Sequence, residues 1–337
     1  MSRNPLKNAK QQLVLVLMAA ILFAAPVVLA QGRDSQKPKE SAENVHVFPV
    51  RGNVYMLVGA GSNITVQVGE RYIIVVDTGL AQYADEVIAT IRKLSDLPIF
   101  FVVNTSSDRD HVGGNTKISH AGWALPNATQ GMAREEEKDA SRLVLPCCAP
   151  IVSSLNAVET LEDPSGKMAA ITFGSEGFKL YNGQPVVFYN KANAHIDGDV
   201  VVFFRSADVI SAGDIFSTTS YPVIESDKGG SIDGVINALN DLVEMLVPKE
   251  SEEGGTYVIP GHGHLSDRND VVNYRDMVTI IRARIEDMVK QGMTLDKVKA
   301  SKPTLDYDGV YGVESGVKFT EAIYRDLTKP KADQSRK

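Results

Sequence analysis

A polar segment that directly follows an apolar run is the part of this chain best suited to chemistry. Residues 99–103 are Ile-Phe-Phe-Val-Val, a composition typical of a buried strand, and residues 104–115 read Asn-Thr-Ser-Ser-Asp-Arg-Asp-His-Val-Gly-Gly-Asn. This segment brings Asp108, Asp110 and His111 close together. Carboxylates and imidazoles are ordinary ligands of Zn²⁺ and also serve as general acids and bases. The segment therefore indicates a metal centre or a proton-transfer site at the end of a strand.

Four other segments carry a carboxylate or an imidazole within three residues of a glycine. They are Asp77 in Val-Asp-Thr-Gly, His195 in Ala-His-Ile-Asp-Gly-Asp, Asp214 in Ser-Ala-Gly-Asp-Ile-Phe, and His262 in Ile-Pro-Gly-His-Gly. Aspartate and glycine are common turn residues, so one such segment alone would be weak evidence. The significance of the segments lies in their joint presence and their order.

Taken in order, the five segments resemble the motifs of the metallo-β-lactamase superfamily over roughly residues 45–327. In that family the first loop reads His-x-His-x-Asp-His and is followed by a Gly-Gly-Asn turn. Here Ser106 and Asp108 replace the two histidines, whereas Asp110 and His111 match the motif. The counterpart of Asp77 in the family braces the metal loop without binding the ion. The resemblance implies the same supporting role for Asp77, and it leaves Ser106 beside the metal.

The resemblance implies two metal positions of unequal quality. The second position would be formed by four matching residues: Asp110, His111, His262 and the bridging Asp214. Two imidazoles and two carboxylates suit Zn²⁺ or Fe²⁺. The first position would have only Asp108, His195 and the shared Asp214, because a neutral serine hydroxyl is a poor zinc ligand. We therefore expect one tightly held zinc ion, with iron as an alternative, and a weaker or absent second ion.

The activity implied by the resemblance is hydrolysis of an ester, thioester, lactone or amide carbonyl, β-lactams included, by metal-bound water. The candidate catalytic residues are Asp110 and Asp108, and either Asp108 or His195 would be available as a general base if it is not a ligand. Two alternatives stay open: a binding or partner protein that retains the fold without catalysis, and an iron site for redox or oxygen chemistry. The four matching ligands favour the enzyme, because a binding protein has no chemical need for them together.

Short apolar runs separated by turns predict the elements that position these residues. Strands are expected at residues 45–50, 54–59, 62–68, 72–76, 97–105, 169–173, 178–181, 186–189, 200–204, 209–212 and 256–259. Helices are expected at residues 81–95, 130–143, 232–246, 266–291, 294–300 and 319–327. This order is compatible with an α+β fold in which two sheets pack face to face, the four-layer αββα sandwich, and also with an ordinary α/β fold. The family resemblance selects the sandwich.

The beginning of the chain has the pattern of a secretory signal. Residues 1–30 combine a basic start, an apolar stretch and a small-residue exit at Ala30, and an uncleaved membrane anchor is the alternative. Residues 31–44 are polar and predict a flexible leader, residues 45–328 the metallo-β-lactamase-like domain, and residues 329–337 a disordered tail. We therefore expect a periplasmic or secreted protein.

The charge balance narrows the range of partners. The 337 residues are 43% apolar and 23% charged, with a net charge of −7. Removing the three bases of residues 1–30 leaves 32 basic and 42 acidic residues, a net charge of −10. This balance argues against nucleic acid and anionic membranes as partners and leaves a small-molecule substrate. The sequence does not predict an oligomeric state.

Overall fold

The computed structural model describes residues 44–122, 148–160, 170–173, 178–251 and 254–329. The predicted signal, nearly all of the predicted leader and tail, and the predicted helix at residues 130–143 lie outside the described residues. No helix among the described residues is both long and apolar enough to span a membrane.

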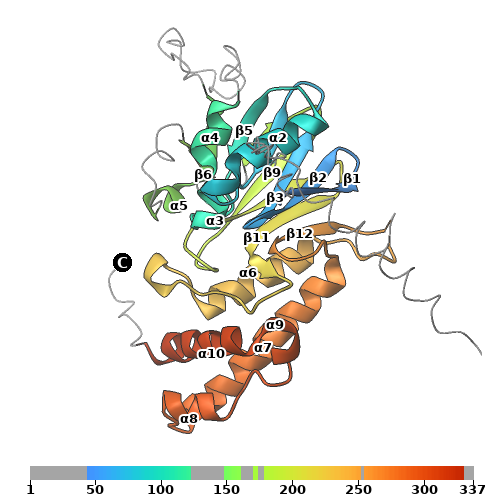
Figure 1. Cartoon of the computed structure of the whole chain (residues 1–337). Helices are drawn as coiled ribbons and strands as arrows, with labels where there is room; N and C mark the ends of the chain where they lie inside the picture. Colours follow the sequence, from blue (N-terminus) through green and yellow to red (C-terminus); the bar gives the residue numbers. More distant parts are fainter. Residues whose placement is uncertain (1–43, 123–147, 161–169, 174–177, 252–253, 330–337) are drawn as a thin grey trace, which may run out of the picture. The chain divides into compact units, whose positions relative to one another are not determined.

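Two β-sheets form the centre of the described part of the chain (Figure 1). The seven-stranded sheet has the order β1-β2-β3-β4-β5-β6-β7, with strands His46–Arg51, Val54–Ala60, Ser62–Val68, Ile73–Val76, Ile99–Val103, Ile151–Ser154 and Ala170–Phe173. The five-stranded sheet has the order β12-β11-β10-β9-β8, with strands Tyr257–His262, Val209–Ser217, Asp199–Phe204, Pro185–Lys191 and Phe178–Tyr181. Strands β4 and β5 are parallel, as are β11 and β12. Each parallel pair therefore brings two strand ends to one edge of its sheet.

Helices lie between groups of strands and, as α7–α10, after the last strand. In chain order they are η1 Ala81–Tyr83, α2 Ala84–Leu94, α3 Arg109–Val112, α4 Asn115–His120, α5 Leu155–Thr160, η4 Ser226–Lys228, α6 Ile232–Met245, α7 Arg268–Lys290, α8 Leu295–Ala300, α9 Asp308–Tyr311 and α10 Val313–Thr328. Helices α6 and α7 each begin after a residue whose side chain caps the N-terminus. The Ser231 side chain accepts a hydrogen bond from the Gly234 N–H, and Asp267 forms a capping box with Asp270.

Alternation of side chains along the strands builds four layers. In β4, Ile73 and Val75 pack in the cluster that contains Val87 and Ile91 of α2, whereas Ile74 and Val76 pack against the other sheet. In β10, the side chains of Val200, Val202 and Phe204 face the first sheet, and those of Val201 and Phe203 face α6, α7 and α10. Figure 1 shows α2 and α4 on one side of the sheets and α6, α7 and α10 on the other. The predicted α+β, four-layer αββα sandwich is confirmed.

Some observed elements are longer than predicted, and one strand was not predicted at all. Strand β11 runs to Ser217 rather than ending at residue 212, because it stays paired with β12 beyond Gly213. Helix α10 begins at Val313 rather than at residue 319, and its first turns are largely exposed and polar. Strand β6 was not predicted, since only Ile151 and Val152 of its four residues are apolar.

A pair of buried amides closes the polar segment that follows β5. Asn104 Nδ2 donates to Asn115 Oδ1 over 3.0 Å, and Asn115 Nδ2 donates to Asn104 Oδ1 over 2.9 Å. The Thr78 hydroxyl also donates to Asn115 Oδ1 over 3.0 Å. Both asparagines are 1% exposed. Because the pair joins the two ends of the segment, it fixes the path of every residue between them.

We expect Asn115→Ala to lower the free energy of unfolding by about 2–3 kcal/mol, because Asn104 then loses both hydrogen bonds of the pair in a buried place. Urea denaturation of the variant and the parent protein measures this difference. Asn269→Ala, at an exposed position in the first turn of α7, is the control and should change stability by less than about 0.5 kcal/mol. Equal effects of the two substitutions would contradict a bracing role for the amide pair.

Candidate metal centre

The ends of strands from both sheets deliver the candidate ligands. Asp77 follows β4, and the segment after β5 carries Asp108 at the N-terminus of α3, with Asp110 and His111 inside that helix. From the second sheet, His195 lies between β9 and β10, Asp214 lies within β11, and His262 ends β12. The seam between the two sheets thus collects side chains from segments far apart in the sequence.

The structure brings together Asp110, His111 and His262, whose ligand atoms lie within 4.8 Å of one another. Asp214 Oδ1 lies 3.1 Å from His111 Nε2 and 3.4 Å from His262 Nε2. Asp110 Oδ2 lies 3.2 Å from His262 Nε2. These four residues form the set that the sequence predicts for the second position, and we use that name for them below.

Asp77 orients the His111 imidazole. His111 Nδ1 lies 2.8 Å from Asp77 Oδ2, and the same carboxylate accepts hydrogen bonds from the Thr105 N–H at 2.8 Å and the Thr105 hydroxyl at 2.6 Å. Asp77 has a φ of 63°, a left-handed conformation that is uncommon for aspartate. With Nδ1 engaged by the carboxylate, Nε2 is the ring nitrogen presented to the second position, an arrangement typical of histidines that ligate metals.

The donor set of the second position fits a metal ion. His111 is fully buried, and among the residues that the structure describes its Nε2 makes no hydrogen bond of acceptable geometry, although Asp214 Oδ1 is 3.1 Å away. A buried polar atom without a partner is costly, and a metal ion would supply the partner. Two imidazoles and two carboxylates are a common ligand set for Zn²⁺ and Fe²⁺.

Two contacts hold the segment that carries His262. Asn63 Nδ2, from β3 of the first sheet, donates to the backbone carbonyls of Pro260 at 2.9 Å and Gly263 at 3.1 Å. A Cβ at Gly261 would lie 2.5 Å from Asp214 Oδ1, so only glycine lets the backbone of β12 pass so close to this carboxylate. The Pro-Gly-His-Gly segment thus depends on both of the sheets that it joins.

Asp108, His195 and Asp214 form the second cluster, which we call the first position. His195 Nε2 lies 3.3 Å from Asp108 Oδ2, and His195 Nδ1 lies 3.4 Å from Asp199 Oδ1 and 3.9 Å from Asp214 Oδ2. Asp214 therefore faces both positions, with one carboxylate oxygen turned to each. The Ser106 hydroxyl accepts a hydrogen bond from the Asp108 N–H at 3.2 Å and is fully buried.

A lysine that the sequence analysis missed contacts Asp108, one of the residues of the first position. Lys228 Nζ donates to Asp108 Oδ1 over 2.9 Å and lies 2.8 Å from Glu225 Oε2. Asp199, which contacts His195, was also missed as a supporting residue. The Glu-Ser-Asp-Lys-Gly pattern at residues 225–229 predicts a turn and nothing more. The contact of Lys228 with Asp108, which lies 120 positions earlier, follows from the tertiary fold.

Charge coupling sets the ionisation of both clusters. Burial opposes ionisation of Asp108, but the hydrogen bonds and charges of His195 and Lys228 outweigh it and lower the pKa of this carboxyl to about 2. Hydrogen bonds to Asp110 and Asp214 raise the pKa of His262 to about 9. Burial alone would lower the pKa values of His111 and His195, yet their carboxylate neighbours raise both well above the usual range. A metal ion would compete with protons on these imidazoles.

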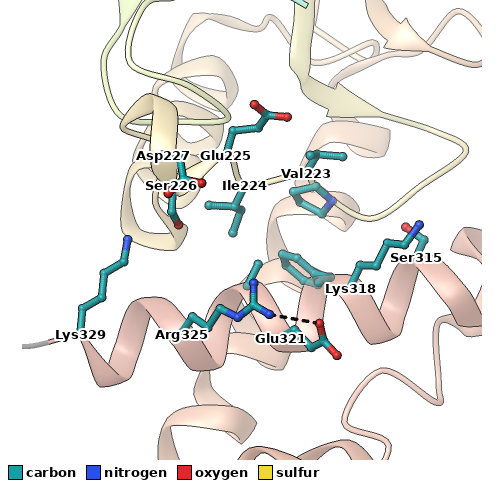
Figure 2. Close-up of a pocket in the computed structure, with 13 residues that line it drawn as sticks. Val223, Ile224, Glu225, Ser226, Asp227, Ser315, Lys318, Glu321, Arg325 and Lys329 are labelled. Atoms are coloured by element: carbon teal, nitrogen blue, oxygen red, sulfur yellow. Dashed lines mark ion pairs between the residues drawn. The ribbon is translucent and has the colours of Figure 1, made fainter.

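Both clusters open into a cavity of about 280 Å³. The rest of the lining comes from the end of β11, from the residues that follow it and from α7: Ser217, Thr219, Ser220, Tyr221, Pro222, Val223 and Tyr274. A larger cavity of about 530 Å³ lies between residues 222–227 and α10, as Figure 2 shows, and it contains none of the candidate ligands. The smaller cavity is therefore the candidate substrate site.

The sequence profile of the metallo-β-lactamase superfamily matches residues 57–262, which is more than half of the chain. With the two-sheet fold, this match shows that the chain belongs to the metallo-β-lactamase superfamily. The matched residues include every candidate ligand and Lys228. Among curated protein sequences, none matches this chain.

Solved structures share the fold at low sequence identity. The DIM-1 metallo-β-lactamase is 16% identical, with a TM-score of 0.51 over 70% of this chain and 97% of that chain. The sec-alkylsulfatase Pisa1 from Pseudomonas sp. is 13% identical, with a TM-score of 0.61 over 83% of this chain and 50% of that chain. This chain therefore matches half of the alkylsulfatase. At these identities the likeness concerns the fold alone.

We expect the metal-free protein to lose stability as the pH rises from about 6.5 to 9. The pKa of His262 is raised from 6.5 to about 9 in the folded protein, so its stabilising contribution is complete below pH 6.5 and is lost as the pH passes 9. Allowing for partial exposure, the loss from His262 alone is on the order of 1–2 kcal/mol. Urea denaturation of chelator-treated protein at several pH values measures it.

Two substitutions test whether His262 causes this pH effect. His262→Gln removes the group and should reduce the loss of stability, whereas His264→Gln, at an exposed residue two positions later, is the control and should leave the loss of stability unchanged. Saturating zinc should reverse the sign of the pH dependence, because ligands must be deprotonated to bind the ion. A metal-free protein that gains stability over this pH range would contradict the coupling between His262 and its carboxylate partners.

Proposed function

We propose that this protein is a hydrolase with one metal ion, zinc or iron, held at the second position by Asp110, His111, His262 and Asp214. The observation that carries the proposal is the buried His111 Nε2, which has no hydrogen-bond partner and faces the other three residues. When bound, the metal would polarise a carbonyl and lower the pKa of a water molecule to ~7. That chemistry suits cleavage of an ester, thioester, lactone or amide, including a β-lactam.

The residues of the chain would divide the remaining work. Asp77 fixes the orientation of His111 through Nδ1, whereas Asp110 Oδ2 and His262 Nε2, which lie 3.2 Å apart, would both be ligands of the metal. Asp108 lines the cavity as a carboxylate with a pKa of about 2, so it stays ionised near neutral pH and is a weak base. We therefore assign Asp108 to orienting the attacking water by accepting its hydrogen bond. The proton of that water, whose pKa the metal would lower, would pass to bulk water through the open cavity.

The cavity supports a small, partly polar substrate. Its volume of about 280 Å³ lies at the lower end of the range for small-molecule sites, and the hydroxyls of Ser217, Thr219 and Ser220 line one wall. The names of the structural neighbours add two substrate classes to the proposal, β-lactams from DIM-1 and secondary alkyl sulfates from Pisa1. Carbonyl compounds come first, because the proposed chemistry requires one polarised oxygen next to the attacked atom.

We also propose that the protein works in the periplasm or is secreted. The pattern of residues 1–30 supports export, and the acidic balance of the remaining residues supports a small-molecule substrate over nucleic acid or an anionic membrane. Detection of the protein in periplasmic extracts, with a mass that corresponds to cleavage after Ala30, would support this location.

Asp110→Ala and His262→Ala should each reduce bound metal below about 0.1 ion per chain and lower kcat/KM at least about a thousandfold, because each removes a ligand from an open site. Ser106→Ala should change both quantities less than about threefold, since its hydroxyl bonds only within the loop. Elemental analysis of purified protein and a substrate panel of lactams, lactones, thioesters and alkyl sulfates give the two readouts.

Two results would contradict the proposal in different ways. A wild-type protein that binds no metal after zinc is added back would leave the binding or partner protein as the better interpretation. Complete loss of metal in Ser106→Ala, with Asp110→Ala unaffected, would show that the ligands are assigned to the wrong residues.

A further inference from the structure

We propose that the Lys228 ammonium neutralises Asp108, one of the three candidate ligands of the first position, and thereby disfavours a second metal ion there, so that the centre holds one metal ion. This inference rests on the proposed function, because it assumes that the second position binds a metal. It concerns the first position, where Asp108 and Ser106 stand in place of the two histidines of the family motif.

The contacts of Lys228 place its charge on the candidate ligand. Nζ lies 2.9 Å from Asp108 Oδ1 and 2.8 Å from Glu225 Oε2, so two carboxylates from different segments hold one ammonium. The side chains of Lys228 and Asp108 are 24% and 21% exposed, so solvent screens this pair only in part. Glu225 also lines the larger cavity, but in Figure 2 its carboxylate points away from α10. This carboxylate is the second partner of the Lys228 ammonium.

The turn that carries Lys228 is fixed against the loop that carries His195. The Glu225 N–H donates to the His195 carbonyl over 3.0 Å, and the Asp197 N–H donates to the Lys228 carbonyl over 2.8 Å. Gly229 ends the turn with a φ of 88°, and a Cβ there would lie 2.7 Å from Asp197 Cβ. These backbone contacts set the direction from which the Lys228 ammonium reaches Asp108. The path of the backbone therefore fixes the geometry of this ion pair.

The two positions differ in whether a cation of the protein already contacts a candidate ligand. At the first position, Asp108 Oδ1 binds the Lys228 ammonium, and Asp108 Oδ2 lies 3.3 Å from His195 Nε2. At the second position, the candidate ligands contact one another, and among the described residues His111 Nε2 makes no hydrogen bond. A divalent ion at the first position would have to displace the ammonium or lie beside it, and like charges repel. The geometry thus favours a metal ion at the second position and disfavours one at the first.

Zinc stoichiometry and affinity test this inference without reference to activity. Calorimetric titration of chelator-treated full-length protein with Zn²⁺, checked by elemental analysis, should give about one ion per chain for the wild type. Lys228→Met removes the charge while keeping an unbranched side chain, and it should add a second ion or tighten the second binding event about tenfold or more. Lys228→Arg should remain at one ion, since it keeps the cation.

Matched variants separate the charge at this place from general effects. Lys117→Met removes another lysine, one that pairs with Asp85 on the exposed surface, and should leave the stoichiometry at one. Lys228→Met combined with Ser106→His and Asp108→His should reach two ions, whereas the two histidines without Lys228→Met should fall short of two. The same titrations on the combined variants keep the test decisive if Lys228→Met alone folds poorly.

The outcomes distinguish this inference from the proposed function. Two zinc ions of similar affinity in the wild type would overturn the role of Lys228 and leave a two-metal hydrolase. No zinc in the wild type but one in Lys228→Met would support the role of Lys228 and overturn the proposed function. No zinc in either protein would overturn both.

Discussion

The buried carboxylate of Asp77 is the interaction on which the rest of the centre depends. It accepts hydrogen bonds from the backbone and hydroxyl of Thr105 and fixes Nδ1 of His111, so one group joins the ends of β4 and β5 to the ligand helix α3. The residue does this from a left-handed backbone conformation, which costs on the order of 1–3 kcal/mol. Hydrogen bonds to a carboxylate are stronger than neutral ones, and three of them offset that cost.

The second constraint is electrostatic, because the seam gathers Asp108, Asp110, Asp199 and Asp214 around three histidines. The two halves of the centre neutralise this negative charge differently. One half presents an imidazole nitrogen that makes no hydrogen bond within the described part of the chain, whereas in the other half a lysine ammonium pairs with Asp108. Asp108 stands where the family motif has a neutral histidine, and Lys228 balances its negative charge.

The sequence predicted most of the fold, because alternating apolar residues and turn residues determine where strands such as β3 and β8 begin and end. It also predicted which residues gather into the two clusters, because their segments resemble a known set of motifs. It missed Lys228, Asp199 and the amide pair of Asn104 and Asn115. Their significance comes from contacts between distant segments, and polar residues in loops show no periodicity. Strand β6 was also missed, because its two apolar residues, Ile151 and Val152, are too few to show an alternation.

Asn63 reaches across the two sheets to carbonyl groups about 200 positions later in the chain, the Gly263 carbonyl among them. The four candidate ligands of the second position lie within this span, because Asp110 and His111 follow β5 while Asp214 and His262 belong to β11 and β12. The two sheets must be assembled before these pairs of residues can meet, and long-range pairing of this kind is slow. A metal ion that binds at the second position would therefore complete its ligand shell only in the folded protein, in the compartment where folding is completed.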